Sequence, residues 1–168
     1  MLNTIRSNFL VKNSTLINTF GDSHDSDFCV GTDENCKFIN NGNDGIDFST
    51  SEVNIIGCTI DGAGDKGISL GEHTHATITN VTIDKVVIGV ASKDLSYANI
   101  DKCNISNAKY GFVLLQKKPE FGPASVKATN VTFNQVMTEC LIEKNSLIIL
   151  NGKTVKGNKA KLFSTFYQ

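Results

Sequence analysis

The sequence predicts an all-β fold, a right-handed parallel β-helix of about seven coils with ~22 residues in each coil. Three observations lead to this prediction. The chain repeats itself at a fixed step, each repeat holds three short segments of alternating apolar residues, and Asn or Gly stands at the bends between segments. A fixed period of this length is typical of solenoids, whose coils stack and bury one continuous core.

The repeat is visible in the letters of the chain. The segment CTIDGAGDKGISL at 58–70 echoes CKFINNGNDGIDF at 36–48, one repeat earlier in the chain. Two stretches interrupt the period, and we expect insertions at 17–27 and at 117–123. Insertions in solenoids become loops on one face. Successive repeats begin at Ser14, Cys36, Cys58, Val81, Cys103 and Val131, so that the last step is longer than the others.

One coil divides into three strands. We expect strands at 67–70, 76–78 and 81–83, a turn at 71–75, a bend at 79–80 and a last turn at 84–88, because Val, Ile and Thr suit a pleated surface. Equivalent apolar residues of all coils then form inward columns. These columns are Ile46, Ile68, Val90 and Phe112; Val11, Ile55, Ile78, Ile100, Ala128 and Leu150; and Leu16, Phe38, Ile60, Ile83, Ile105, Phe133 and Val155.

The bend before each third strand calls for a left-handed backbone. Asn and Gly tolerate this conformation, and six of the seven bend positions carry one of them. Lys102 is the exception. The seven positions are Asn13, Asn35, Gly57, Asn80, Lys102, Asn130 and Gly152.

Both ends of a solenoid expose strand edges. We expect the C-terminal residues Leu162, Phe163, Phe166 and Tyr167 to fold over the last coil. Leu2, Ile5 and Phe9 are candidates for a small cap at the other end. The 168 residues suit a single domain over 1–168, which we expect to be a module of a larger protein. The alternatives are a partner that covers the N-terminal end, or end-to-end self-association.

Composition excludes several classes of protein. Sixteen basic and 17 acidic residues leave a net charge of −1, so we expect no nucleic-acid partner. No apolar run approaches the ~18 residues of a membrane span, and the first 30 residues lack a signal-peptide pattern. Three of the five cysteines share an inward column, which favours packed free thiols over a zinc site. They are Cys36, Cys58 and Cys103.

An acidic cluster in the N-terminal half is a candidate cation site. On the repeat alignment Asp25, Asn43 and Asp65 fall in one column, and Asp47 points outward from its strand. Carboxylates one coil apart suit a hard cation such as Ca²⁺. The alternative is a set of Asp-rich turns that bond their own backbone. The candidate metal ligands are Asp25, Asp44, Asp47 and Asp65.

A second cluster follows the turn after the first strand. Thr50, Glu72, Asp94 and Gln116 stack at the repeat step. A polysaccharide lyase needs a base for the proton next to a uronate carboxyl and a cation to face that carboxylate. The alternative is a solvated turn with ion pairs. The candidate catalytic residues are Glu72, Lys93, Asp94 and Lys117.

The same turns also contain candidate ligand-binding residues. The segment GEHTH brings His73 and His75 close together in the chain, which allows a transition-metal site or a solvated loop. Sugar binding favours aromatic platforms, and these are few. The outward residues of the first strand are mostly small, which argues against catalysis there. The candidate ligand-binding residues are Asp47, Glu72, Lys93, Tyr97, Lys117 and Phe121.

Five segments carry a resemblance to a known family: DSDF (25–28), GNDGIDFSTSEV (42–53), GAGDKGISLGE (62–72), VASKDLS (90–96) and QKKPEFGPA (116–124). The set resembles the β-helix region of bacterial spore-coat CotH-kinase-like surface proteins, within the pectin-lyase-like superfamily. The likeness covers residues ~20–150. It implies a module of an exported polypeptide, at the cell surface or outside the cell. It brings no catalytic residue, because no position matches the basic residues of the lyases.

Two functions remain open. The first is a non-catalytic module that binds, or is displayed against, polysaccharide or protein through the turns at 71–75, 93–97 and 115–124. The alternative is a polysaccharide lyase or uronate epimerase with a cation-assisted site. A third, purely structural role as a spacer would have no ligand at all.

Overall fold

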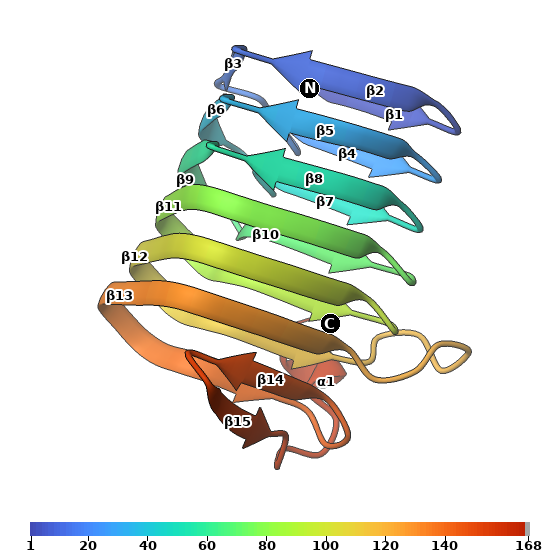
Figure 1. Ribbon diagram of the computed structural model, residues 1–168, viewed down its shortest axis with the longest axis vertical. Coiled ribbons are helices and arrows are strands. Elements are labelled where there is room, and N and C mark those ends of the chain that lie inside the picture. The colour runs from blue at the N-terminus through green and yellow to red at the C-terminus, as the bar shows by residue number, and fades with distance from the viewer. Residues whose placement is uncertain (167–168) are drawn as a thin grey trace.

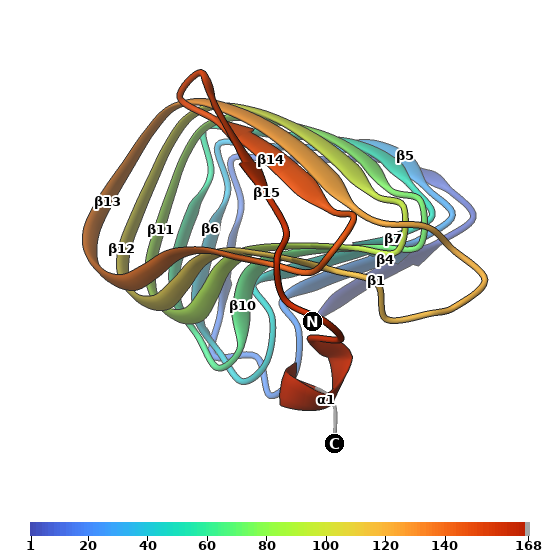
Figure 2. The same ribbon diagram turned by 90° about the horizontal axis from the view of Figure 1, so that it is seen from below.

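The computed structural model describes residues 1–166 and forms one parallel β-helix. Its coils lie one on another from the N-terminus to the C-terminus (Figure 1). Seen along the stack, the outline has three sides, named here face A, face B and face C (Figure 2). The fold class and the coil length are as the sequence predicts.

Each of the first six coils contributes one strand or strand segment to each face, and the last coil contributes to faces A and B. Three long strands run through all three faces: β11 (His75–Lys93), β12 (Tyr97–Leu115) and β13 (Ser125–Ile142). Face A otherwise holds β1 (Leu2–Ile5), β4 (His24–Asp27), β7 (Ile46–Ser49) and β10 (Lys66–Gly71). Face B holds β2 (Asn8–Lys12), β5 (Val30–Glu34), β8 (Glu52–Ile56) and β14 (Leu147–Leu150). Face C holds β3 (Thr15–Ile17), β6 (Lys37–Asn41) and β9 (Thr59–Ala63).

The pairing register corrects one prediction, the insertion at 17–27. Leu2 pairs with His24 and His24 with Ile46, so the regular repeat step already holds in the first coils. Residues 24–27 are the strand β4. The prediction was wrong because His24 and Ser26 fill inward positions that are apolar in other coils, and the segment therefore looks like a polar turn.

The second predicted insertion is confirmed. Tyr97 pairs with Ser125, a longer step than the one from His75 to its partner Tyr97, and the extra residues form the loop between β12 and β13. A smaller irregularity lies at the turn 71–75, where Glu52 pairs with His75, just beyond the regular step. The turn loops of coils four to six therefore differ in length from those of the earlier coils.

All seven predicted bend residues have positive φ, including Lys102 at 57° and Gly152 at 81°. Gly152 lies between β14 and β15 (Lys153–Lys156) rather than within a coil. Two further columns of left-handed residues mark the other corners. The column between faces C and A contains Asn18, Asn40, Gly62, Lys85, Asn107 and Gln135. The column between faces A and B contains Arg6, Phe28, Thr50, Glu72 and Asp94, whose mixed chemistry gives no turn signal in the sequence.

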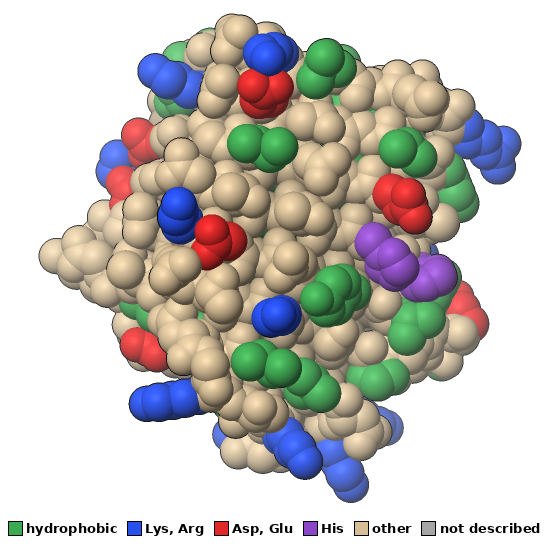
Figure 3. Space-filling view, in the orientation of Figure 1, with side chains coloured by type: hydrophobic (Ala, Val, Ile, Leu, Met, Phe, Trp, Pro, Cys, Tyr) green, Lys and Arg blue, Asp and Glu red, His purple; other side chains and the backbone are tan. Residues whose placement is uncertain are grey.

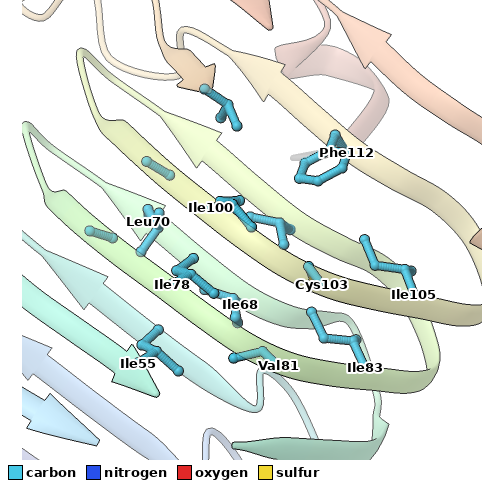
Figure 4. Close-up of a cluster of buried hydrophobic side chains, with 14 of the residues drawn as sticks. Ile55, Ile68, Leu70, Ile78, Val81, Ile83, Ile100, Cys103, Ile105 and Phe112 are labelled. Atoms are coloured by element: carbon cyan, nitrogen blue, oxygen red, sulfur yellow. The ribbon is translucent and has the colours of Figure 1, made fainter. Parts of the chain in front are cut away.

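The core consists of the predicted inward columns without their last predicted member, Val155. Ile55, Ile78 and Ile100 succeed one another on face B, and Ile68 and Phe112 belong to the column of face A (Figure 4). Glycines at the corner leave room for this packing, since a Cβ on Gly67 would lie 2.6 Å from the Cγ2 of Ile83. The three cysteines of the predicted column are buried and free, and burial raises the pKa of Cys103 to about 12.

A polar layer crosses the apolar core in the second coil. His24 and Asp33 are both fully buried, and Nδ1 of His24 lies 2.9 Å from an Asp33 carboxylate oxygen. The other ring nitrogen is 3.0 Å from the hydroxyl of Ser26. Phe9 and Phe48 pack against the imidazole, with ring centroids 4.8 and 5.1 Å away. The apolar columns of the sequence give no sign of this layer.

The C-terminal residues depart from the prediction. Strand β15 runs antiparallel to β14, so Val155 pairs with Ile148 and is not part of the inward column. Helix α1 (Phe163–Phe166) lies outside face A, below it in Figure 2, rather than over the last coil. Leu162 is buried there, while Phe163 remains exposed and Tyr167 lies outside the described residues. The cluster that Leu162 joins consists of Ile88, Ala91, Val113 and Leu115, with Tyr110, Leu141 and Phe166 at its edge.

No separate cap covers the N-terminal coil within residues 1–166. Leu2 and Ile5 lie in β1 and Phe9 lies in β2, so these residues form the first coil itself. Ile5 and Leu10 are exposed on the outside of this coil. No helix in the described part of the chain is long and apolar enough to cross a membrane.

Candidate functional site

Three segments form one continuous surface at the corner between faces A and B, named here the turn ledge (residues 71–75, 93–97 and 116–124). The amide of His73 donates to the carbonyl of Asp94 over 2.8 Å. The amide of Leu95 donates to the carbonyl of Gly122 over 2.8 Å. The loop 116–124 therefore continues the two turns, and it projects from the solenoid in Figure 2.

Buried hydroxyls hold these turns in register. The amide of Thr74 donates to the hydroxyl of Ser96 over 3.1 Å, and the hydroxyl of Thr74 donates to the carbonyl of Gly71 over 2.7 Å. The hydroxyls of Ser51 and Ser146 accept hydrogen bonds from backbone amides in the same way in other coils. Buried amides need such partners, so the ladder fixes the backbone of the ledge.

A shallow groove follows the ledge on its face B side. It consists of two adjoining depressions of about 280 and 370 Å³, which share Val30, Glu52 and His75. We name it the aromatic groove. Figure 3 shows the two histidines of this region as the purple side chains at the edge of face B. Its other lining residues are Phe28, Cys29, Thr50, Ser51 and His73 in one depression, and Val53, Asn54, Ala76, Thr77 and Tyr97 in the other.

Four rings line this groove. The ring centroids of His73 and His75 are 5.0 Å apart, and those of His75 and Tyr97 are 6.4 Å apart. Tyr97 is 39% exposed and Phe28 is 54% exposed. Exposed rings beside the carboxylate of Glu52 combine an apolar platform with a hydrogen-bond acceptor.

The face A side of the ledge carries charged residues. The ammonium of Lys93 is buried and donates to the hydroxyl of Ser69 over 2.7 Å. Asp47 lies beside Ser69 in the neighbouring coil, and Asp25 lies beside Asp47. One carboxylate oxygen of Asp47 is buried and has no hydrogen-bond partner. We name Asp25, Asp27, Asp47, Ser69 and Lys93 the polar strip.

Two acidic side chains of the turns, Glu72 and Asp94, also hold the loop. Lys118 forms an ion pair with Glu72. Burial raises the pKa of the Glu72 carboxyl, but the hydrogen bond and charge of Lys118, together with Ser49 and the charge of Lys93, outweigh it and the net pKa is lowered. One carboxylate oxygen of Asp94 accepts hydrogen bonds from the backbone amides of Lys117 and Lys118, at N···O distances of 2.6 and 2.7 Å. Asp94 thus anchors the loop, although burial raises the pKa of its carboxyl.

Two carboxyl groups of the polar strip, Asp25 and Asp27, are harder to ionise than in water. Burial raises the pKa of Asp25, and the neighbouring carboxylates of Asp27 and Asp47 add to the effect. Burial likewise raises the pKa of Asp27, followed by the charge of Glu72. Burial and the charges of Lys93 and Lys118 lower the pKa of Lys117. The strip thus holds the three acids Asp25, Asp27 and Asp47 and one lysine, Lys93, which contacts Ser69.

The four candidate metal ligands do not converge. Asp25 stacks with Asp47, so the predicted column of Asp25, Asn43 and Asp65 is wrong, for the same reason as the insertion at 17–27. Asp44 and Asp65 instead contact the ammonium of Lys66, which stands 3.3 Å from an Asp44 oxygen. Within residues 1–166 no group of three or more His, Cys, Asp or Glu side chains is arranged to hold a metal ion.

The buried carboxyl of Asp44 should make the free energy of unfolding depend on pH. Burial raises the pKa of its carboxyl from 3.8 to about 6, although Lys66 opposes the shift. Because the folded state binds this proton more tightly, the contribution of Asp44 to stability is fully present below pH 3.8 and is lost as the pH rises through about 6. We expect the free energy of unfolding, measured with urea between pH 4 and 7, to fall less with pH in Asp44→Asn than in the natural chain. Equal slopes would contradict the assignment.

The structure brings together the candidate catalytic residues Glu72, Lys93, Asp94 and Lys117 around the ledge. Phe121 lies in the same loop, where its carbonyl accepts a bond from Gln116. Tyr97 lies on the other side, in the aromatic groove. Sequence reasoning missed Phe28 and Glu52. The signal was present, since Val30, Glu52, His75 and Tyr97 form one outward column at the repeat step.

A family model described as a right handed beta helix region matches residues 3–161. No curated protein matches the chain. The family model confirms the β-helix fold that the resemblance implies. The likeness to CotH-kinase-like surface proteins stays a prediction.

Proposed function

Because the chain belongs to the right-handed β-helix family, we propose that it is a module that binds a polysaccharide in the aromatic groove without changing it chemically. The single observation that carries this proposal is the groove itself, where two depressions join along the coils and rings line both of them. The turns at 71–75 and 93–97, and the loop beside them, form its border.

The shape of the groove favours a chain over a compact ligand. Its central column runs from Val30 through Glu52 and His75 to Tyr97, across four coils. Coils lie ~4.8 Å apart, so the column extends for roughly 14 Å. Rings bind the apolar faces of sugars, while Glu52, Asn54 and Thr77 offer partners for hydroxyl groups.

The contacts of the charged residues support a role without catalysis. Lys93 is bonded to Ser69, Glu72 is paired with Lys118, and Asp94 anchors loop amides. Each of these bonds stabilises the ledge. We further place the module at a bacterial cell surface or in an exported protein, as the sequence resemblance implies, and fractionation of the source cells tests this.

Replacing Tyr97 tests the groove. We expect Tyr97→Ala to weaken polysaccharide binding about tenfold, since an exposed ring contributes ~1 kcal/mol or more to such contacts. Affinity electrophoresis in gels that contain soluble polysaccharides measures the effect. Met137→Ala, which alters a side chain 81% exposed on β13, is the matched control and should bind normally. Equal retardation of the Tyr97 variant and the natural chain would exclude the groove as the binding site.

One observation favours a second function, a polysaccharide lyase or uronate epimerase on the polar strip. The unpartnered oxygen of Asp47 lies beside Ser69, which Lys93 contacts. A carboxylate and a lysine on either side of one serine have the chemistry for proton removal next to a uronate carboxyl. This function requires that the natural chain forms unsaturated or epimerised products and that Lys93→Ala does not.

A further inference from the structure

Two exposed histidines stand next to each other in the turn ledge, beside the aromatic groove. His73 and His75 line the same depression, and their ring centroids are 5.0 Å apart with the ring planes at 87°. Both side chains are exposed, and Figure 3 shows them as adjoining purple groups at the surface. The structure thus places two imidazoles side by side where water and ions reach both of them.

Both imidazoles keep their ring nitrogens available for a ligand. Within residues 1–166, the contacts of these two rings are aromatic, with each other and with Tyr97, and no hydrogen bond or ion pair occupies either ring. The third histidine of the chain, His24, differs, since Asp33 and Ser26 lie 2.9 and 3.0 Å from its two ring nitrogens. A neutral imidazole with a free nitrogen is a good ligand for Zn²⁺, Ni²⁺ and Cu²⁺.

The backbone holds the two histidines at a fixed spacing. The amide of His73 donates to the carbonyl of Asp94, and the amide of His75 donates to the carbonyl of Ser51, each over 2.8 Å. Thr74, between them, is fully buried. A site whose backbone is fixed before its ligand arrives loses little conformational entropy on binding.

The separation of the two rings suits one shared ion. A bond from Zn²⁺ to an imidazole nitrogen is ~2.0–2.1 Å long, which places the ring centroid ~3.2 Å from the ion. Two rings bound to one tetrahedral ion then have centroids ~5 Å apart. The observed separation of 5.0 Å agrees with this value. Because both side chains are exposed, each ring is able to rotate about its side-chain bonds and direct a nitrogen at the ion.

The surroundings of the pair limit the class of ion. Glu52, which pairs with His75 in the neighbouring coil, lines the same depression and brings a negative charge close to a bound cation. Within the described residues no third His, Cys, Asp or Glu side chain completes a set of ligands, so water fills the other positions. Two nitrogen ligands select a late first-row transition metal, whereas Ca²⁺ and Mg²⁺ require oxygen ligands.

We propose that His73 and His75 together bind one divalent transition-metal ion such as Zn²⁺, at the edge of the aromatic groove. This site goes beyond the proposed function, because it takes up the ion when no polysaccharide is present.

Titration of the ¹⁵N-labelled chain with ZnCl₂ alone tests this site. Long-range ¹H–¹⁵N spectra at about pH 7.5 resolve the ring nitrogens of the three histidines. We expect the signals of His73 and His75 to change together, with half-saturation at ~0.1 mM Zn²⁺ or below, while those of His24 stay unchanged. CaCl₂ at the same concentrations should change none of them.

Single variants test whether the two rings act as a pair. His73→Asn and His75→Thr should each weaken zinc binding by at least about tenfold, because one imidazole alone binds the ion weakly. Asparagine tolerates the positive φ of 66° at position 73, and threonine suits the first residue of β11. Thr77→Ala changes another exposed residue of the same strand and should bind Zn²⁺ as the natural chain does.

Three results would overturn the proposal. The first is the absence of zinc binding at ~1 mM. The second is zinc binding that leaves the ring signals of His73 and His75 unchanged, since the ion would then lie elsewhere, for example on a cysteine thiol. The third is an affinity that either histidine variant leaves unchanged. No polysaccharide is present in the titration, so failure of the aromatic groove to retain a sugar does not affect these outcomes.

Discussion

Replacing Asp33 with alanine should lower the free energy of unfolding by about 3–5 kcal/mol. Asp33 is fully buried, and its carboxylate is within 2.9 Å of Nδ1 of the equally buried His24. Removing Asp33 leaves Nδ1 of His24 without its partner in an apolar surrounding, where Phe9 and Phe48 pack against the ring. Urea denaturation at pH 7, followed by circular dichroism, measures the change.

A double variant identifies the cause of this loss. Replacing both residues, as His24→Leu with Asp33→Leu, removes both polar groups and should recover much of the stability. Glu34→Ala is a control on the same strand, since Glu34 lies at the surface in an ion pair with Lys12 and should contribute less than about 1 kcal/mol. If Asp33→Ala costs no more than Glu34→Ala, the buried pair does not stabilise the second coil.

Replacing Phe112 with alanine should cost about 3–5 kcal/mol, because it leaves a cavity in the core. The ring is fully buried in the inward column of face A, and its centroid lies 6.0 Å from that of Phe133 at a right angle. The same denaturation experiment measures the loss.

Phe112→Leu and Met137→Ala complete this series. Leucine fills most of the space, so we expect an intermediate loss. Met137 is exposed on the neighbouring coil segment, and its replacement should change stability by less than about 0.5 kcal/mol. Equal stability of Phe112→Ala and Met137→Ala would mean that the inward column is not the core.

The fold could be predicted from the sequence because each coil repeats the same physical requirements. Apolar residues must return at each inward position, as Ile55, Ile78 and Ile100 do, and bends must accept a left-handed backbone, as Asn13 and Asn35 do. The prediction was wrong where polar residues take the inward positions of a coil. His24 and Ser26 face inward as polar residues, because Asp33 on the opposite wall supplies the partner of the imidazole.

The candidate site was predictable only in part. Stacking at the repeat step placed Glu72 and Asp94 at one corner, and the structure agrees. It could not reveal that Asp94 bonds loop amides or that Lys66 lies between Asp44 and Asp65, since these contacts depend on side-chain directions. The position of Leu162 and Phe166 was predicted wrongly because apolar residues fit equally well over an open end or on face A.

The central claim is that this β-helix module holds a polysaccharide and leaves it unchanged. Incubation with a panel of acidic and neutral polysaccharides in heavy water, with and without Ca²⁺, tests it most directly when the products are measured by mass spectrometry. We expect retention of a polysaccharide by the natural chain, reduced retention by Tyr97→Ala, and no change in polymer mass or deuterium content. Unsaturated fragments, added water or incorporated deuterium that disappear in Lys93→Ala would contradict the claim and assign catalysis to the polar strip.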